Sequence, residues 1–175
     1  MKYLIVSDIH GGGLEAEFII NKFKEEKCDY LICLGDVLYH GPRNDLPLNY
    51  APKKVISLLN EYANKIICVK GNCEAEVDQM VLNFEILDSY DSYLNGKDCH
   101  FEHGHHLDLY SGNAEIVFTG HTHIPLCEEE NGYVHINPGS ITIPKNGSKK
   151  SYIIWENHNI KCLDIENNIV FEYNY

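Results

Sequence analysis

Short apolar runs alternate with longer amphipathic segments in the first part of the chain. The runs at residues 3–7, 30–34 and 66–69 are nearly continuously apolar, as expected of strands that are covered on both faces. An amphipathic helix is expected between the first two runs, over residues 14–27, and a second helix is expected to begin at Pro52. This alternation of strand and helix predicts a parallel sheet with right-handed crossovers.

The second half of the chain has a different pattern, in which short strands are separated by turn residues. Residues 88–103 predict a hairpin that turns at Asn95-Gly96. Residues 37–51 keep no period and predict a long loop, of a kind that is often functional. No repeat or linker divides the chain, so we expect a single domain over residues 1–175, with two packed sheets and helices outside. Further short strands are expected at residues 115–119, 124–129, 133–136, 152–156, 160–165 and 169–173.

Composition and charge narrow the classes of protein that this pattern fits. Of the 175 residues, 44% are hydrophobic, as in ordinary globular proteins, and no apolar run approaches the roughly 20 residues of a membrane-spanning helix. The 14 Lys and Arg against 26 Asp and Glu give a formal net charge of −12, which disfavours binding to a nucleic-acid polymer. We therefore expect neither a membrane nor a nucleic-acid partner.

The cysteines predict a reducing environment. There are seven of them, scattered and without a Cys-x-x-Cys pair, and most lie in apolar stretches such as residues 31–34. The chain begins at Met1 with an apolar strand, and no signal peptide is recognisable. We expect reduced thiols that pack as small hydrophobic side chains, and a cytoplasmic location.

Five polar clusters share one structural context, because each directly follows a predicted strand. Most of them alone are ordinary turn chemistry, but Gly120-His121-Thr122-His123 is more specific, because two imidazoles two positions apart on a loop can converge on one centre. In α/β sheets, however, ligands bind at the carboxyl ends of the strands, and turns do not explain five clusters in this order. Asp, His and Asn are ligands for Mn, Zn, Fe(II), Co or Mg, so the set predicts a metal centre. The clusters are Asp8-x-His10, Gly35-Asp36, Gly71-Asn72, His103-Gly104-His105 and Gly120-His121-Thr122-His123.

The order of these clusters resembles the calcineurin-like metallophosphoesterase superfamily. The segments 35–44, Gly71-Asn72-Cys73-Glu74 and Asn137-Pro138-Gly139-Ser140 narrow the resemblance to the YfcE/MJ0936-type phosphodiesterase family. The likeness extends over nearly the whole chain, including Ala51-Pro52 and residues 76–80. It implies an α/β fold, a four-layer α/β/β/α sandwich of the metallo-dependent phosphatase type, which agrees with the two sheet-forming halves.

The resemblance also implies two adjacent metal sites that share one carboxylate. Asp36 is the implied bridging ligand, and its negative charge would offset the repulsion between two cations roughly 3.5–4 Å apart. Two divalent ions are expected, with Mn²⁺ first and Zn²⁺, Fe²⁺, Ni²⁺ or Co²⁺ as alternatives. The implied ligands are Asp8, His10, Asp36 and His123 at one site, and Asp36, Asn72, His103 and His121 at the other.

The implied reaction is hydrolysis of a small phosphodiester by in-line attack of a metal-bridging hydroxide on phosphorus. Cys73 stands where many superfamily members have a histidine that protonates the leaving group. It is either a weak proton donor or a packing residue, and His10, His40 and His105 are the alternative acids. The expected catalytic residues are Asp36, Asn72 and His10, and the expected substrate contacts are His40, Arg43, Cys73 and His105. Arg43 is suited to bidentate bonding of phosphate, and the alternative role for it is to brace the loop.

Two other functions stay open at this stage. One is a phosphomonoesterase on the same scaffold. The other is a catalytically silent binding module, similar to the retromer scaffolding subunit, which resembles this fold but lacks catalytic ligands; here every ligand position is filled. An exposed strand edge late in the chain would permit a homo-oligomer, and the sequence does not name the physiological substrate.

Overall fold

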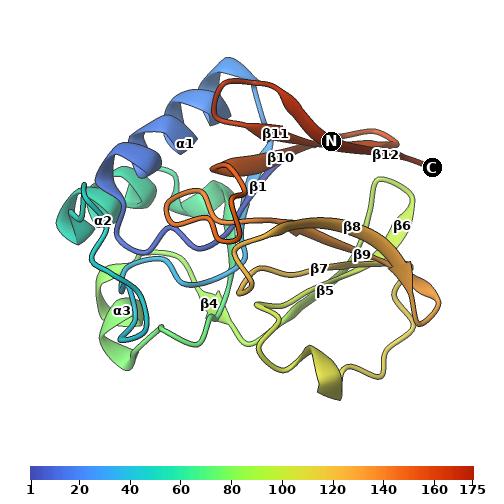
Figure 1. The fold of residues 1–175 in the computed structure, drawn as a ribbon, viewed down its shortest axis with the longest axis horizontal. Coiled ribbons are helices and arrows are strands. Elements are labelled where there is room, and N and C mark those ends of the chain that lie inside the picture. Colours follow the sequence, from blue (N-terminus) through green and yellow to red (C-terminus); the bar gives the residue numbers. More distant parts are fainter.

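Two β-sheets lie face to face in the computed structural model, which describes residues 1–175 (Figure 1). The larger sheet contains, in spatial order, β12 (Ile169–Asn174), β11 (Asn159–Asp164), β10 (Ser151–Glu156), β1 (Lys2–Val6), β2 (Tyr30–Cys33), β3 (Ile66–Val69) and β4 (Ile86–Leu87). The smaller sheet contains β5 (Tyr90–Leu94), β6 (Lys97–Phe101), β7 (Ile116–Phe118), β9 (Tyr133–Pro138) and β8 (Pro125–Glu130).

The parallel centre of the larger sheet confirms the prediction from the apolar runs. Strands β1, β2, β3 and β4 pair in parallel, whereas β10 joins β1 in antiparallel register. Leu4 pairs with Leu31, and Leu31 pairs in turn with Ile66. Because parallel strands run in one direction, their carboxyl ends meet at one edge of the sheet, where the first three polar clusters follow.

Helices α1 (Gly13–Glu25) and α2 (Pro52–Asn60) cover the outer face of the larger sheet, as Figure 1 shows. Helix α1 buries Ala16, Ile19, Ile20 and Phe23, which recur at helical spacing. One α-helix and one strand were not predicted from the sequence, the short helix α3 (Glu76–Val81) and the two-residue strand β4. Helix α3 buries only Asp78, so its sequence contains no apolar stripe from which a helix could be predicted.

An aromatic core fills the space between the two sheets. The Phe101 and Phe118 rings of the smaller sheet stack with centroids 4.8 Å apart, and Phe118 lies 5.4 Å from Trp155 of the larger sheet. Trp155 in turn packs on Tyr3 at 5.2 Å. Burying such rings stabilises each side chain by about 1.5–3 kcal/mol, so this layer fixes how the two sheets face each other.

The outer face of the smaller sheet carries a loop with a single 3₁₀ turn, η2 (Leu107–Leu109), where the larger sheet carries α-helices. Tyr110, next to this turn, stacks on His100 of β6 with ring centroids 4.3 Å apart. The other 3₁₀ turn, η1 (Ala63–Lys65), follows α2. The two-sheet sandwich predicted from the family resemblance is confirmed, with its fourth layer reduced to this loop.

All seven cysteines are free thiols, and five of them are buried. Cys33 and Cys68 lie opposite each other on neighbouring strands as part of the apolar core. The predicted role of the cysteines as packing residues is therefore confirmed for these positions. No helix in the protein combines the length and apolar character needed to cross a bilayer.

Candidate metal centre

The polar clusters predicted at strand ends come together where the carboxyl ends of strands from the two sheets meet. From the larger sheet, Asp8 and His10 follow β1, Asp36 follows β2 and Asn72 follows β3. From the smaller sheet, His103 follows β6, and His121 and His123 follow β7. The two sheets thus contribute to one site from opposite sides.

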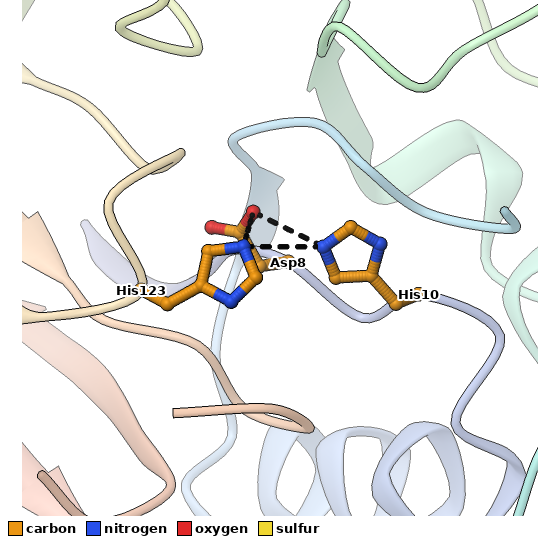
Figure 2. Close-up of side chains that lie close together, drawn as sticks. All are labelled: Asp8, His10 and His123. Atoms are coloured by element: carbon orange, nitrogen blue, oxygen red, sulfur yellow. Dashed lines mark hydrogen bonds and ion pairs between the residues drawn. The ribbon is translucent and has the colours of Figure 1, made fainter. Parts of the chain in front are cut away.

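The first group of side chains is Asp8, His10 and His123, shown in Figure 2. Oδ1 of Asp8 lies 3.4 Å from Nε2 of His10 and 3.2 Å from Nε2 of His123. The two Nε2 atoms are 3.4 Å apart. Three potential ligand atoms, all on buried residues, therefore point at one small space.

The second group is centred on Asp36. Its Oδ2 lies 3.4 Å from Nε2 of His103 and 3.6 Å from Nε2 of His10, so this carboxylate stands between the two groups. Oδ1 of Asn72 is 3.2 Å from Nε2 of His103 and 2.7 Å from Nδ1 of His121. All seven ligand positions named from the sequence are brought together.

Backbone carbonyls set the orientation of three of the four candidate imidazole ligands, whereas Nδ1 of the fourth, His121, contacts Asn72. Nδ1 of His10, His103 and His123 lies 2.7, 2.6 and 2.7 Å from the carbonyl oxygens of Tyr39, Leu34 and Ile143, respectively. A carbonyl oxygen only accepts, so in each pair Nδ1 donates its hydrogen. In the neutral ring, Nε2 then carries the lone pair and faces the site, which is the usual arrangement of metal-binding histidine.

The charges of the site also fit a bound cation. Burial would raise the pKa of Asp8, but the neighbouring imidazoles of His10 and His123 outweigh burial and hold the pKa of Asp8 well below its usual range. Burial likewise opposes a charge on His103, yet its hydrogen bond with Asp36 raises the pKa of the imidazole to about 9. The buried Oδ1 of Asp8 has no hydrogen-bond donor. A buried anionic oxygen of this kind requires a positive partner, which a metal ion would supply.

Several of these residues have a strained backbone. Positive φ values place non-glycine residues in the left-handed region, at a cost on the order of 1–3 kcal/mol each. Such strain persists only where the surrounding structure enforces it, and it clusters at functional sites. Five of the seven candidate ligands have this conformation: Asp8 (φ 55°), His10 (45°), Asp36 (54°), His121 (66°) and His123 (63°).

Glu74 joins two of the strand-end loops, although the sequence assigned it no role. Its Oε1 accepts a hydrogen bond from the Val37 N–H at 2.6 Å, and its Oε2 accepts from the N–H groups of Asp36, at 2.9 Å, and of Gly71. Asp36 Oδ1 accepts from the Cys73 N–H at 2.8 Å. Gly71 is required here, because a Cβ at that position would collide with Asp36. The loops after β2 and β3 are therefore fixed to each other beside Asp36.

Of the four predicted substrate contacts, two line a cleft beside the candidate metal ligands and two do not. Arg43 and Cys73 line a small cleft together with Asp36, Asn72, His121 and His123. His40 instead packs between the rings of Tyr39 and Tyr50, and it does not line the cleft. His105 lies beside the centre, with its ring 5.5 Å from His103 and 6.1 Å from His121.

Lys145 also lines the cleft, and the sequence did not indicate it. The residue lies in the loop between β9 and β10, more than twenty positions away from any of the polar clusters. Its only signal in the sequence is the turn-forming Asn146-Gly147 that follows it, so only the fold reveals its position.

Most of the chain matches a known family. Residues 1–159 match the model of the calcineurin-like phosphoesterase superfamily domain. The chain therefore belongs to the calcineurin-like phosphoesterase superfamily, and it is a hydrolase of phosphoric esters.

Within this superfamily, the chain is similar to phosphodiesterase YfcE of Escherichia coli (strain K12). The two are 44% identical over 163 residues, which cover 90% of this chain and 88% of the relative. The solved structure of YfcE, a phosphoesterase from E. coli, superposes with a TM-score of 0.95 at 38% identity and covers 99% of both chains. The probable metallophosphoesterase YsnB of Bacillus subtilis (strain 168) is 32% identical, over 88% of this chain and 83% of the relative.

Proposed function

We propose that this hydrolase is a phosphodiesterase with a dinuclear metal centre. The observation that carries the proposal is the position of Asp36, whose Oδ2 lies within 3.6 Å of both His10 and His103. One cation would be held by Asp8, His10, Asp36 and His123, and the other by Asp36, Asn72, His103 and His121. The donor set of carboxylate, imidazole and amide favours a divalent ion such as Mn²⁺, with Zn²⁺, Fe²⁺, Ni²⁺ and Co²⁺ as alternatives.

The reaction is hydrolysis by in-line attack of a hydroxide on phosphorus, which forms one P–O bond as the bond to the leaving oxygen breaks. When bound, the two cations would lower the pKa of the attacking water and offset charge on the phosphoryl oxygens. Asp36 supplies the negative charge between the two positions, and Asn72 adds a neutral oxygen that limits the total charge. Arg43 lies in the cleft, where its guanidinium can donate hydrogen bonds to a phosphate group of the substrate.

Cys73 contributes packing rather than acid catalysis in this proposal. Burial and the neighbouring carboxylate of Asp36 raise the pKa of its thiol to about 12, so the thiol is a weak proton donor at neutral pH. Its Sγ also accepts a contact from Asn72 Nδ2 at 3.3 Å. The enzyme should therefore act best on diesters whose leaving group departs without a strong acid.

Two chromogenic esters with the same leaving group test the proposed reaction. We expect protein that has been reconstituted with Mn²⁺ to hydrolyse bis(p-nitrophenyl) phosphate with a higher kcat/KM than p-nitrophenyl phosphate. A preference for the monoester would identify a phosphomonoesterase instead. If the protein retains no metal after reconstitution and hydrolyses neither ester, it is the catalytically silent binding module.

A further inference from the structure

Two cationic side chains lie on the cleft beside the candidate metal centre. Arg43 comes from the long loop before α2, and Lys145 comes from the loop between β9 and β10. Arg43 is the only arginine in the chain. The cleft has one carboxylate in its lining, that of Asp36. The imidazoles of His121 and His123 also line it.

Neither cation forms an ion pair, although acidic partners are plentiful on a chain with a formal net charge of −12. Neighbouring lysines in the same loop do find partners. Lys149 lies 2.9 Å from Asp164, and Lys150 lies 2.6 Å from Glu15. The two exposed cations at the cleft thus remain available to a ligand.

The backbone of Lys145 is held in place relative to His123. The Lys145 N–H donates to the His123 carbonyl at 3.3 Å, and the Lys145 carbonyl accepts from both the N–H and the hydroxyl of Ser148, at 3.0 and 2.7 Å. The same loop provides the Ile143 carbonyl that accepts from the His123 ring. The position of Lys145 is therefore tied to that of a candidate metal ligand.

Charge balance indicates what the two cations bind. Two bound divalent ions would outweigh the two ionised carboxylates among the candidate ligands, Asp8 and Asp36, by two positive charges. A hydroxide and a phosphodiester, with one negative charge each, would neutralise that excess completely. Arg43 and Lys145 then carry two further positive charges, which match the charge of about −2 on a phosphate monoester group at neutral pH. Arg also binds phosphate in bidentate geometry.

We propose that Lys145, together with Arg43, binds a second phosphate group of the substrate, next to the diester that is cleaved. The substrate class is thus a small phosphodiester that carries an additional phosphate. This inference rests on the proposed phosphodiesterase function, and it makes Lys145 a specificity-determining residue.

A matched pair of chromogenic diesters tests the assignment. Thymidine 5′-(p-nitrophenyl phosphate) has one phosphate, and its 3′-phosphorylated form differs only by the second. We expect wild-type enzyme to favour the 3′-phosphorylated diester in kcat/KM, mainly through a lower KM. Lys145→Gln should reduce that preference by about tenfold, as should Arg43→Gln, because each removes a charged hydrogen bond to the second phosphate. Lys53→Gln, an exposed lysine on α2, is the control and should keep the wild-type preference.

Two outcomes would overturn the assignment. The first is that Lys145→Gln keeps the wild-type preference for the 3′-phosphorylated diester. The second is that Lys145→Gln lowers kcat/KM equally for both diesters, which would place Lys145 at the scissile phosphate. Binding of thymidine 3′,5′-bisphosphate and thymidine 5′-monophosphate to the metal-loaded protein, measured by calorimetry, gives an answer that does not depend on turnover. If neither diester is hydrolysed but the bisphosphate binds more tightly than the monophosphate in a Lys145-dependent way, only the phosphodiesterase proposal fails.

Discussion

At the scale of single residues, Asp36 is the carboxylate on which the proposed centre depends most. Its Oδ2 lies 3.6 Å from Nε2 of His10 and 3.4 Å from Nε2 of His103, and the residue is almost fully buried. Asp36→Asn keeps the shape but removes the negative charge that would hold two cations together. We expect metal content after gel filtration to fall below one equivalent and kcat/KM for bis(p-nitrophenyl) phosphate to fall by at least about a hundredfold.

Asp88→Asn provides a matched control for this change. Asp88 is exposed and has no ion-pair partner, so this variant should retain wild-type metal content and activity. Two bound metals and normal activity in Asp36→Asn would show that Asp36 does not bridge the sites.

The sequence indicated the identities of the candidate ligands but not the conformation of their backbone. Residue type and position after a strand were enough to name Asp8 and His123. The left-handed φ angles at both residues depend on how the loops are held by the folded sheets, which residue type does not reveal. Lys145 was missed for a related reason. Its backbone is held next to His123 by a hydrogen bond between residues 22 positions apart, which the local sequence does not reveal.

At the scale of elements, Glu74 connects the ends of β2 and β3 at the metal centre. Glu74→Gln replaces one accepting oxygen by an amide nitrogen that would face backbone N–H donors. We expect the affinity for Mn²⁺, measured by titration of metal-free protein, to fall by about 10–100-fold, as for other residues that orient ligands. Glu76→Gln, an exposed neighbour on α3, should leave the affinity at the wild-type value. Equal affinities in wild type and Glu74→Gln would refute this positioning role.

His100 gives the hairpin β5–β6 a pH-dependent contribution to stability. Burial lowers the pKa of His100, but its hydrogen bonds with Glu102 and Asp91 outweigh this, and the net shift is upward. Because the pKa of His100 is higher in the folded state, its protonation stabilises the fold fully at pH values below the pKa of His in the unfolded chain, about 6.5. This stabilisation is lost as the pH rises through the pKa of His100 in the folded protein. The His100→Gln substitution should therefore lower the urea midpoint more at pH 6 than at pH 9. A larger loss at pH 9 would contradict this interpretation.

Prediction from the sequence was most successful for elements with a strong period. The parallel strands and the hairpin at Asn95-Gly96 were predicted because apolar runs and turn residues act locally. Helix α3 and strand β4 were missed, since a six-residue helix with exposed Val77 and Met80 has no buried stripe. Their stability depends on tertiary contacts such as the hydrogen bond that the Ile86 N–H donates to Gln79 Oε1, which the local sequence pattern does not encode.

At the scale of the whole molecule, the candidate ligands come from both sheets, so bound metal should link the two halves of the sandwich. Removal of metal by a chelator should lower Tm by roughly 5–10 °C, compared with protein at a free Mn²⁺ concentration about a hundred times Kd. Addition of Mn²⁺ should restore Tm in the wild type but not in Asp36→Asn. Identical Tm values with and without metal would contradict this linkage.

The architecture as a whole was predicted from family resemblance more than from periodicity. The sequence pattern indicated two sheet-forming halves, but it contained no local signal for how they pack. That packing depends on contacts between distant residues, such as Phe118 with Trp155. The negative charge of the chain is also understood only in the folded molecule, because part of it is concentrated at Asp8 and Asp36, where cations are expected to bind.

The central claim is that two metal ions act together in one phosphodiesterase site. The most direct test is a titration of metal-free protein with Mn²⁺, in which hydrolysis of bis(p-nitrophenyl) phosphate and bound metal are measured in the same samples. We expect activity to reach its maximum only as the second equivalent of Mn²⁺ per chain binds. Full activity at one equivalent, or activity that does not depend on added metal, would contradict it.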